Sequence, residues 1–536
     1  MSLRNCLGLS LALSALALLA ACGNSGSGTV NPVPPPSGSF SNSNLNGTYV
    51  FSVSGIDLNG APYALLGTFT ANGQGGITAG TIDINDADLS APVPNSAISG
   101  SNGYSVTVDG RGEISLGTSA LGTITLDFVL QDSSHGLVTE FDSNATGSGT
   151  IDLQSSGVSP VGTYAFSLAG EDYSSGTNAN LFATVGNFTV GSGGAISGLV
   201  DFNDSQFAYT NQALSGSLVL GPSSTPSTTL SATFPSNTFG VPLTCDVIAI
   251  DASHLKVIEM DTFANLIGDA YAQTSGTFPS GTLAFTMAGS YPTATNASAA
   301  GGFIVTDGAG NITSSSTADS NNTGTVSPSP VTFSGSYATA GAGRYTVSLA
   351  GFSDGTQYVA YPYNNGVFLL ETDNNGVMIG AAFPQTQNTL AGSQGYALNF
   401  TGVNLTDGVE VDDIAEFATN TTGLTVTGVV DENYQPSGSP NQGLALSGTY
   451  TTPDSNGRGG IGANAGSNSN STLNGGFDIT YYSVDGTTFP FIETDANGQV
   501  TSGVFVEQSS SASSAARPHL FVVKPFARPR SSFRKK

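Results

Sequence analysis

The sequence predicts an all-β protein of four tandem antiparallel β-meander units, on three observations. Glycine, serine, threonine and asparagine recur along the whole chain, with 70 Gly, 29 Phe and 18 Tyr among 536 residues. No sustained helical periodicity follows Ala21. Short β-rich runs alternate with turn-forming clusters. A chain of this length is also too long for one hydrophobic core, so several domains are expected.

Blocks of sequence recur four times in the same order, which predicts homologous units at 45–155, 159–273, 277–386 and 392–508. The opening block is Gly-Thr-Tyr-x-Phe or a looser variant of it, and it occupies 47–51, 162–166, 281–285 and 395–400. The late block is Glu-x-Asp, with these carboxylates: Glu140 and Asp142, Glu259 and Asp261, Glu371 and Asp373, Glu493 and Asp495.

Each unit is predicted to be a meander of about seven or eight strands, since its connections are short and contain no helical crossover. Turns such as Asp109-Gly110 supply the positive φ that tight hairpins require. A small up-and-down barrel of lipocalin-like architecture fits this pattern, because closure removes exposed strand edges. A β-sandwich is the alternative, since the strand count alone does not separate closure from stacking.

The N-terminus has the three zones of a secretory signal peptide over 1–21, with Arg4, an apolar run from Leu7 to Leu19 and small residues at its end. That run is too short for a stable membrane span. Leu19-Ala20-Ala21-Cys22 resembles the lipobox of bacterial lipoproteins. The resemblance implies cleavage before Cys22 and acylation of its thiol, and Gly23 after it implies the outer membrane. An ordinary signal peptide followed by an incidental cysteine is the alternative.

The repeat pattern from about 45 to 508 resembles large tandem-repeat lipoproteins of environmental bacteria, more weakly from 277 onward. Their units open with Gly-Thr-Tyr-x-Phe and close with a Glu-x-Asp strand. The resemblance implies no particular activity. Residues 22–44, rich in Pro, Gly and Ser, are predicted to be a tether. The basic segment 509–536 is predicted to be a disordered tail, with docking on a polyanion or on the acidic units as the alternative.

Charge is distributed unevenly. Apart from Arg4 and seven basic residues within 517–536, the chain has four basic residues against all 38 acidic ones, so 23–516 carries a net charge of −34. Such a surface repels nucleic acid and anionic lipid. Loss of Cys6 with the signal and acylation of Cys22 leave Cys245 without a disulfide partner. Its apolar neighbours predict a buried, inert thiol.

The late Glu-x-Asp blocks are the main candidate sites, because residues two apart on a strand face the same way and paired carboxylates bind Ca²⁺ or transfer protons. We favour a structural interpretation, a solvent-facing strand that leads into a hairpin, since two carboxylates supply few of the roughly six to eight oxygens around Ca²⁺. His135 and His254 occur in matching Asp-x-Ser-His segments, which we interpret as turns and not as catalytic sites.

One hydrolase-like motif, Gly351-Phe352-Ser353-Asp354-Gly355, lacks the helix that a nucleophile elbow requires, and we interpret it as a hairpin loop. No cofactor or nucleotide motif is found.

These observations favour a non-catalytic, multivalent surface-binding or structural module in the bacterial cell envelope. Its partners would be the membrane, through the lipid anchor, and an unknown envelope or extracellular ligand. One alternative is a carrier of small apolar ligands inside the barrels, although inward residues such as Phe51, Phe69 and Phe166 fill such an interior equally well. The second alternative is an enzyme with an unrecognised site.

Overall fold

We describe a computed structural model of the chain. It describes Pro35 and residues 38–511, except 101, 173–179, 205–207, 220–227, 233–242, 294–295, 374–375, 407, 435–439, 467–470, 472, 474–475 and 497. The predicted signal peptide, Cys22 and the basic part of the tail lie outside the described residues. Within the described part of the chain, no helix has the length and apolar character that a membrane span needs.

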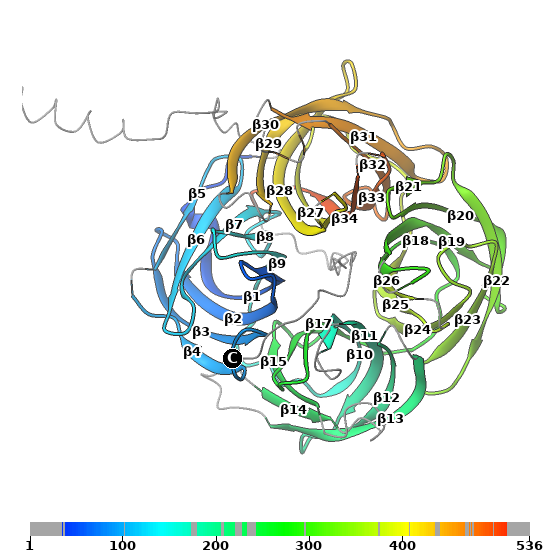
Figure 1. Cartoon of the computed structure of the whole chain (residues 1–536), viewed down its shortest axis with the longest axis horizontal. Coiled ribbons are helices and arrows are strands. Elements are labelled where there is room, and N and C mark those ends of the chain that lie inside the picture. The colour runs from blue at the N-terminus through cyan, green and yellow to red at the C-terminus, as the bar shows by residue number, and fades with distance from the viewer. Residues whose placement is uncertain are drawn as a thin grey trace, which may run out of the picture.

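Four antiparallel sheets follow one another along the chain and stand in a ring (Figure 1). We call them unit 1 (46–153), unit 2 (162–272), unit 3 (281–384) and unit 4 (395–507). Contacts join β2 to β16, β10 to β24 and β19 to β33, and β28 of unit 4 returns to β9 of unit 1. The predicted all-β class is therefore confirmed, and the four sheets form one closed assembly.

The first half of the ring contains units 1 and 2. Unit 1 consists of β1 (Asn46–Asp57), β2 (Pro62–Asn72), β3 (Ile77–Asp86), β4 (Val93–Ala97), β5 (Gly103–Val106), β6 (Arg111–Thr118), β7 (Gly122–Leu130), β8 (His135–Phe141) and β9 (Ala145–Leu153), preceded by the short 3₁₀ helix η1 (Asn42–Asn44). Unit 2 consists of β10 (Gly162–Asp172), β11 (Asn180–Val190), β12 (Ala195–Asn203), β13 (Ala208–Val219), β14 (Thr228–Ala232), β15 (Leu243–Ala249), β16 (His254–Glu259) and β17 (Ala264–Ala272).

The second half contains units 3 and 4. Unit 3 consists of β18 (Gly281–Ser290), β19 (Ala297–Thr306), β20 (Asn311–Asn322), β21 (Thr325–Val326), β22 (Val331–Thr339), β23 (Tyr345–Ala350), β24 (Gln357–Tyr363), β25 (Gly366–Glu371) and β26 (Val377–Pro384). Unit 4 consists of β27 (Gly395–Asn404), β28 (Val409–Asn420), β29 (Thr425–Tyr434), β30 (Asn441–Tyr450), β31 (Arg458–Ala465), β32 (Phe477–Tyr482), β33 (Thr488–Glu493) and β34 (Gln499–Glu507).

The units differ in how completely their strands close. Units 2 and 4 are closed eight-stranded barrels, so the sandwich alternative is wrong for them. In unit 3, β19 at one end of the strand order also pairs with β20, which is next to the other end. The order of unit 1 ends at β4 and β5, and only isolated bonds bridge that gap, such as the one from the Ser99 amide to the Gly117 carbonyl oxygen (2.8 Å).

Aromatic side chains fill the barrel interiors. In unit 1, Tyr49 stacks on its cross-strand partner Phe69 with ring centroids 5.6 Å apart, and Phe51 lies 6.0 Å from Phe69. The same arrangement recurs in unit 2, where Phe166 is also buried. Gly67 is opposite Phe51 because a Cβ there would lie 2.8 Å from the ring. The predicted inward orientation of Phe51, Phe69 and Phe166 is confirmed.

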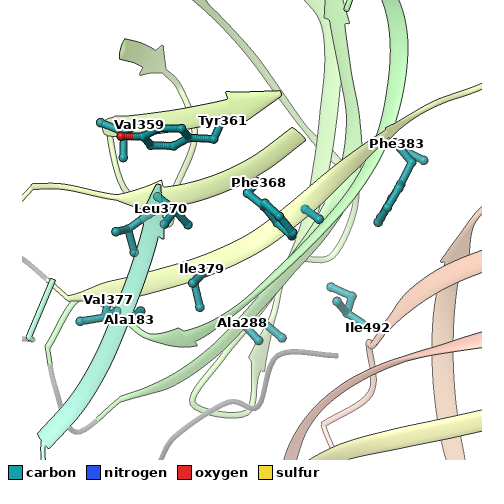
Figure 2. Packing of buried hydrophobic residues seen from close by; sticks show 14 of the residues in the cluster. Ala183, Ala288, Val359, Tyr361, Phe368, Leu370, Val377, Ile379, Phe383 and Ile492 are labelled. Atoms are coloured by element: carbon teal, nitrogen blue, oxygen red, sulfur yellow. The ribbon is translucent and has the colours of Figure 1, made fainter. Parts of the chain in front are cut away.

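Apolar side chains on the outer barrel faces hold neighbouring units together. Between units 1 and 2, Leu66 packs in a cluster with Ile248 and Ile258, and between units 4 and 1, Leu137 packs with Ile414. A larger cluster joins units 2, 3 and 4, as Figure 2 shows for the side chains around Ile379. Strands at these contacts are buried on both faces, as β16 and β25 are along their whole length.

The chain enters and leaves the ring at the same place. Phe40 is buried in the core of unit 1, and the Asn44 side-chain amide donates to the Ser510 carbonyl oxygen (2.9 Å). Residues 38–44 therefore pack on unit 1, although the sequence assigned them to the tether. Their anchor, Phe40, is an isolated apolar residue without a strand-like periodicity around it.

Candidate functional site: the seams between barrels

The four Glu-x-Asp blocks lie where one unit meets the next. We call these contacts seams 1–2, 2–3 and 3–4, and the contact of unit 4 with unit 1 the closing seam. Each glutamate ends, or nearly ends, a strand and is buried, with exposed fractions of 4% or less for Glu140, Glu259, Glu371 and Glu493. The expectation that these carboxylates face solvent is wrong for the glutamates, because the neighbouring unit covers them.

The aspartates of these blocks bind backbone within their own unit. Each accepts a hydrogen bond from the amide of the residue 17 positions earlier, which lies on the preceding strand or, for Thr356, directly before it. For example, Asp373 Oδ2 accepts from the Thr356 amide at 2.9 Å, and Asp495 Oδ2 accepts from the Asp478 amide at 2.7 Å. These carboxylates therefore stabilise the hairpins that the adjoining unit contacts.

An asparagine of the preceding unit inserts into each block and donates to two backbone carbonyl oxygens. The four side-chain amides bind as follows: Asn85 to Glu259 (2.8 Å) and Ala264 (3.0 Å), Asn203 to Glu371 (3.0 Å) and Gly376 (2.9 Å), Asn321 to Glu493 (3.2 Å) and Gln499 (2.9 Å), and Asn433 to Glu140 (2.6 Å) and Ala145 (2.8 Å). The last bond runs from unit 4 to unit 1, so the contact between successive units also closes the ring.

A glutamine directly after the last strand of each unit makes a second repeated bond to the next unit. The side-chain amides donate to these carbonyl oxygens: Gln154 to Ala249 (2.8 Å), Gln273 to Pro362 (2.6 Å), Gln385 to Ser483 (2.9 Å) and Gln508 to Leu130 (2.9 Å). Each amide satisfies a backbone oxygen that the seam removes from water, where an unpaired group would cost about 1–3 kcal/mol.

Ion pairs make the third seam contact. An aspartate two residues before each inserted asparagine points to the same outer face of its strand. Arg344 binds Asp201 across seam 2–3 at 2.6 Å, and Arg458 binds Asp319 across seam 3–4 at 2.8 Å. Across the closing seam, Arg111 binds Asp431 at 3.1 Å.

Seam 1–2 lacks this arginine. Among the described residues, no basic side chain pairs with Asp83, the counterpart of Asp201. Burial raises the pKa of Asp83 to about 7, helped by Asp246 of unit 2. Lys256 spans this seam elsewhere, 2.8 Å from Asp269 and 3.9 Å from Asp152 of unit 1. All four basic residues between 23 and 516 therefore lie at seams.

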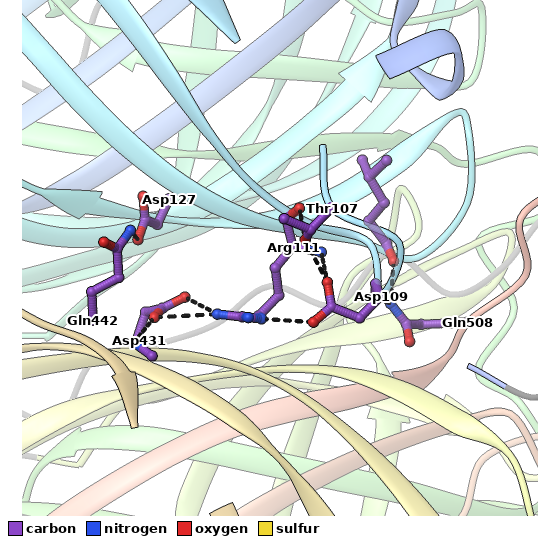
Figure 3. Close-up of polar contacts among 9 residues, drawn as sticks. Thr107, Asp109, Arg111, Asp127, Asp431, Gln442 and Gln508 are labelled. Carbon is purple, nitrogen blue, oxygen red and sulfur yellow. Dashed lines mark hydrogen bonds and ion pairs between the residues drawn. The ribbon is translucent and has the colours of Figure 1, made fainter. Parts of the chain in front are cut away.

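The closing seam carries an excess of carboxylates (Figure 3). Arg111 lies between Asp109 (3.0 Å) and Asp431, and Asp127 accepts a 3.4 Å bond from Gln442 of unit 4. Burial, with Asp431 and Glu113 nearby, raises the pKa of Asp127 well above its usual range. Burial also raises the pKa of Glu416 to about 8.

The two histidines begin β8 and β16, directly after the predicted turns, but differ in their surroundings. Asp132 accepts from the Ser134 amide at 2.6 Å, and Asp251 accepts from the Ser253 amide at the same distance, which confirms the turns. His254 is in addition buried, with Nε2 2.6 Å from Asp269. Burial alone would raise the pKa of the Asp269 carboxyl, but Lys256 and His254 hold it well below the usual range.

Two other sequence predictions concern single nucleophilic side chains. Cys245 is buried in the core of unit 2, and burial raises the pKa of its thiol, so the prediction of a buried thiol is confirmed. Ser353 lies in the hairpin loop between β23 and β24, as predicted, and its hydroxyl donates to Asp354. Across the described ranges, no group of three or more His, Cys, Asp or Glu side chains is arranged to hold a metal ion.

Sequence reasoning missed the asparagine and glutamine of each seam. Their signal was present, because Asp-x-Asn recurs at 83–85, 201–203, 319–321 and 431–433. A glutamine also follows the last strand of every unit. Aligning the four units residue by residue would have revealed both.

No protein-family model matches the chain, and no curated protein matches it. One similar solved structure is the isotype 1 transferrin binding protein B from serogroup B Neisseria meningitidis, with 9% identity, TM-score 0.19 and coverage of 69% of this chain and 82% of that chain. Another is a mutant of the vaccine antigen transferrin binding protein B from Haemophilus parasuis Hp5, with 9% identity, TM-score 0.18 and coverage of 70% and 83%. At such TM-scores, neither similarity carries an argument about function.

Proposed function

We propose that this chain is a lipid-anchored, non-catalytic protein of the bacterial cell envelope, whose four β units act as one closed ring that binds an envelope or extracellular ligand. The observation that carries the proposal is closure of the ring, in which Asn433 of unit 4 and Gln508, directly after unit 4, bind unit 1. Hairpin loops of four units then have fixed spacing. Multivalent contact through linked weak sites benefits from such spacing, since little orientational freedom is lost on binding.

The hydrogen bonds and ion pairs that the polar side chains make support a non-catalytic role. The carboxylates that attracted a catalytic or metal-binding hypothesis support hairpins and seams, and the basic residues of the units pair with aspartates. Ser353 donates to the neighbouring Asp354 and belongs to a loop between two strands. A nucleophile elbow would instead require a strand before the serine and a helix after it.

Filling of the barrels argues against the carrier alternative. In unit 4, Phe489 stacks on Phe505 at 4.7 Å, and Tyr396 packs against the same ring at 5.5 Å. In unit 3, Phe285 packs edge-on against Phe333. A carrier needs an interior that its own side chains leave open.

The anchor is tested in the producing bacterium. Globomycin, which blocks lipoprotein signal peptidase, should cause a lipidated precursor to accumulate, and Cys22→Ala should release the protein from membranes. A Cys22→Ala protein that stays fully membrane-bound after a high-salt wash would contradict lipid anchoring.

Binding is tested with purified Cys22→Ala protein against peptidoglycan sacculi, lipopolysaccharide vesicles and capsular polysaccharide in co-sedimentation assays. The proposal expects retention on at least one of these, weakened about tenfold or more when Asn433→Ala disrupts the ring. Absence of retention on all three, together with turnover of a chromogenic ester or glycoside, would overturn it.

A further inference from the structure

The closing seam differs from the other three because no linker joins its two units. Short linkers join units 1 and 2, 2 and 3, and 3 and 4, whereas unit 4 meets unit 1 only through non-covalent contacts. The chain leaves unit 4 at Gln508 and Ser509, both of which bind unit 1. Opening this seam would separate units 1 and 4 without disturbing any barrel.

The charges that face one another there come from several elements of both units. Unit 1 contributes Asp109 before β6, Arg111 and Glu113 on β6, and Asp127 on β7, whereas unit 4 contributes Glu416 on β28 and Asp431 on β29. Four of these carboxyl groups therefore surround one arginine, and Glu113, which is exposed, lies near Asp127. Nearby, Asp412 of β28 accepts from the hydroxyls of Thr146 and Ser148 of unit 1 and of Thr401.

Ionisation of all these carboxyl groups at once is energetically unfavourable, because of where Asp127 lies. Its side chain is buried, Oδ2 accepts one long bond from Gln442, and Oδ1 has no hydrogen-bond partner. Arg111 directs Nε to Asp109 and Nη1 to Asp431, so it does not bind Asp127 directly. A buried carboxylate without a cation is destabilising, and protonation removes that cost.

We propose that the closing seam is a pH-sensitive clasp, in which protonated carboxyls around Arg111 keep the ring closed and their ionisation lets units 1 and 4 separate. Opening exposes the Asn433 and Gln508 amides and the Glu140 hairpin to other partners. Seams 1–2, 2–3 and 3–4 stay together because linkers hold their units in place.

The direction of the pH dependence follows from the raised pKa values. A carboxyl with a raised pKa in the closed ring contributes stability that is present at low pH and lost as pH rises through that value. Burial raises the pKa of Glu416 to about 8, from an ordinary value of 4.5, and raises the pKa of Asp127 well above its usual range. Closure should thus be strongest below about pH 4.5 and weaken as pH rises towards 8 and beyond.

The test measures distances across two seams in full-length Cys22→Ala protein. Spin labels at Thr406→Cys of unit 4 and Ser143→Cys of unit 1, both exposed, report on the closing seam. A matched pair at Leu58→Cys of unit 1 and Thr262→Cys of unit 2 reports on seam 1–2. The distance distribution between the two spin labels is measured by double electron–electron resonance at several pH values between 5 and 10.

The proposal expects the closing-seam distance to lengthen and broaden above about pH 8 while the control distance stays constant and the far-ultraviolet circular dichroism is unchanged. Asp127→Asn and Glu416→Gln, which mimic the protonated state, should each move the opening to higher pH by about one unit or more. Asp83→Asn, the matched change at seam 1–2, should leave the opening where it was.

A constant closing-seam distance up to pH 10 would overturn the proposal. So would simultaneous separation of both pairs, which indicates global unfolding, or an opening pH that neither Asp127→Asn nor Glu416→Gln alters.

Discussion

Seam 2–3 and the closing seam share their amide contacts but differ in their charges. At both, an asparagine donates to two backbone carbonyl oxygens, and a glutamine donates to another. At seam 2–3, Arg344 donates hydrogen bonds to both carboxylate oxygens of Asp201, through Nε (2.7 Å) and Nη2 (2.6 Å). At the closing seam, Arg111 divides its bonds between Asp109 and Asp431.

This difference indicates that the amide hydrogen bonds determine how two units are oriented against each other. The charged groups determine the pH range over which that contact is stable. Amide hydrogen bonds do not change with pH, so they supply the same contact at every seam. An arginine that makes two hydrogen bonds to one carboxylate holds it in a fixed geometry. When one arginine is shared among several carboxylates, some of these carboxylates must either be protonated or repel one another.

Removal of the arginine at seam 2–3 should have the largest effect. Arg344→Met leaves the buried Asp201 carboxylate with neutral donors, including Tyr361, and should reduce the free energy of unfolding by about 3–5 kcal/mol. Arg111→Met should cost less, because protonation of the surrounding carboxyls compensates. Urea unfolding at pH 7 measures both, and equal losses would show that the two seams do not differ in charge pairing.

Loss of an inserted asparagine should have an intermediate effect. Asn203→Ala and Asn433→Ala each leave two buried carbonyl oxygens without their donor, at a cost of about 1–3 kcal/mol. The two variants should be similarly destabilised in urea. Only Asn433→Ala should enlarge the molecule in gel filtration, since no linker holds the closing seam, and equal elution of both variants would contradict this.

Substitution of Asp83, the aspartate of seam 1–2 that pairs with no basic side chain among the described residues, should have a smaller effect on stability, and that effect should depend on pH. Burial raises the pKa of Asp83 to about 7, so its contribution to stability is present below about pH 4 and lost as pH rises through 7. Asp83→Asn should therefore leave the melting temperature unchanged at pH 4 and raise it at pH 8. The reverse pattern would mean that Asp83 has a basic partner.

Divalent cations should have the smallest effect. Asp495 already accepts a backbone amide, and Glu493 is buried. With a net charge of −34 over 23–516, Ca²⁺ and Mg²⁺ at equal ionic strength should raise the melting temperature slightly and equally by screening. A saturable rise specific to Ca²⁺ that disappears in Asp495→Asn would restore the calcium-site hypothesis.

The sequence predicted individual barrels better than their assembly. Alternation of apolar and polar residues is local, and Phe51 and Phe69 could be placed inside a barrel from it. Seam contacts join positions far apart, such as Arg111 and Asp431, and no local periodicity encodes them. The Glu-x-Asp blocks were recognised as special, but their burial depends on a neighbouring unit that one unit's sequence does not reveal.

Closure of the ring is tested most directly by small-angle X-ray scattering of Cys22→Ala protein at pH 6. The account predicts a radius of gyration only slightly above the roughly 23 Å of a compact body of about 480 residues, with the excess due to the two terminal segments. It also predicts one main maximum in the distribution of interatomic distances. An elongated distribution with separate maxima, typical of barrels on a string, would contradict the closed ring.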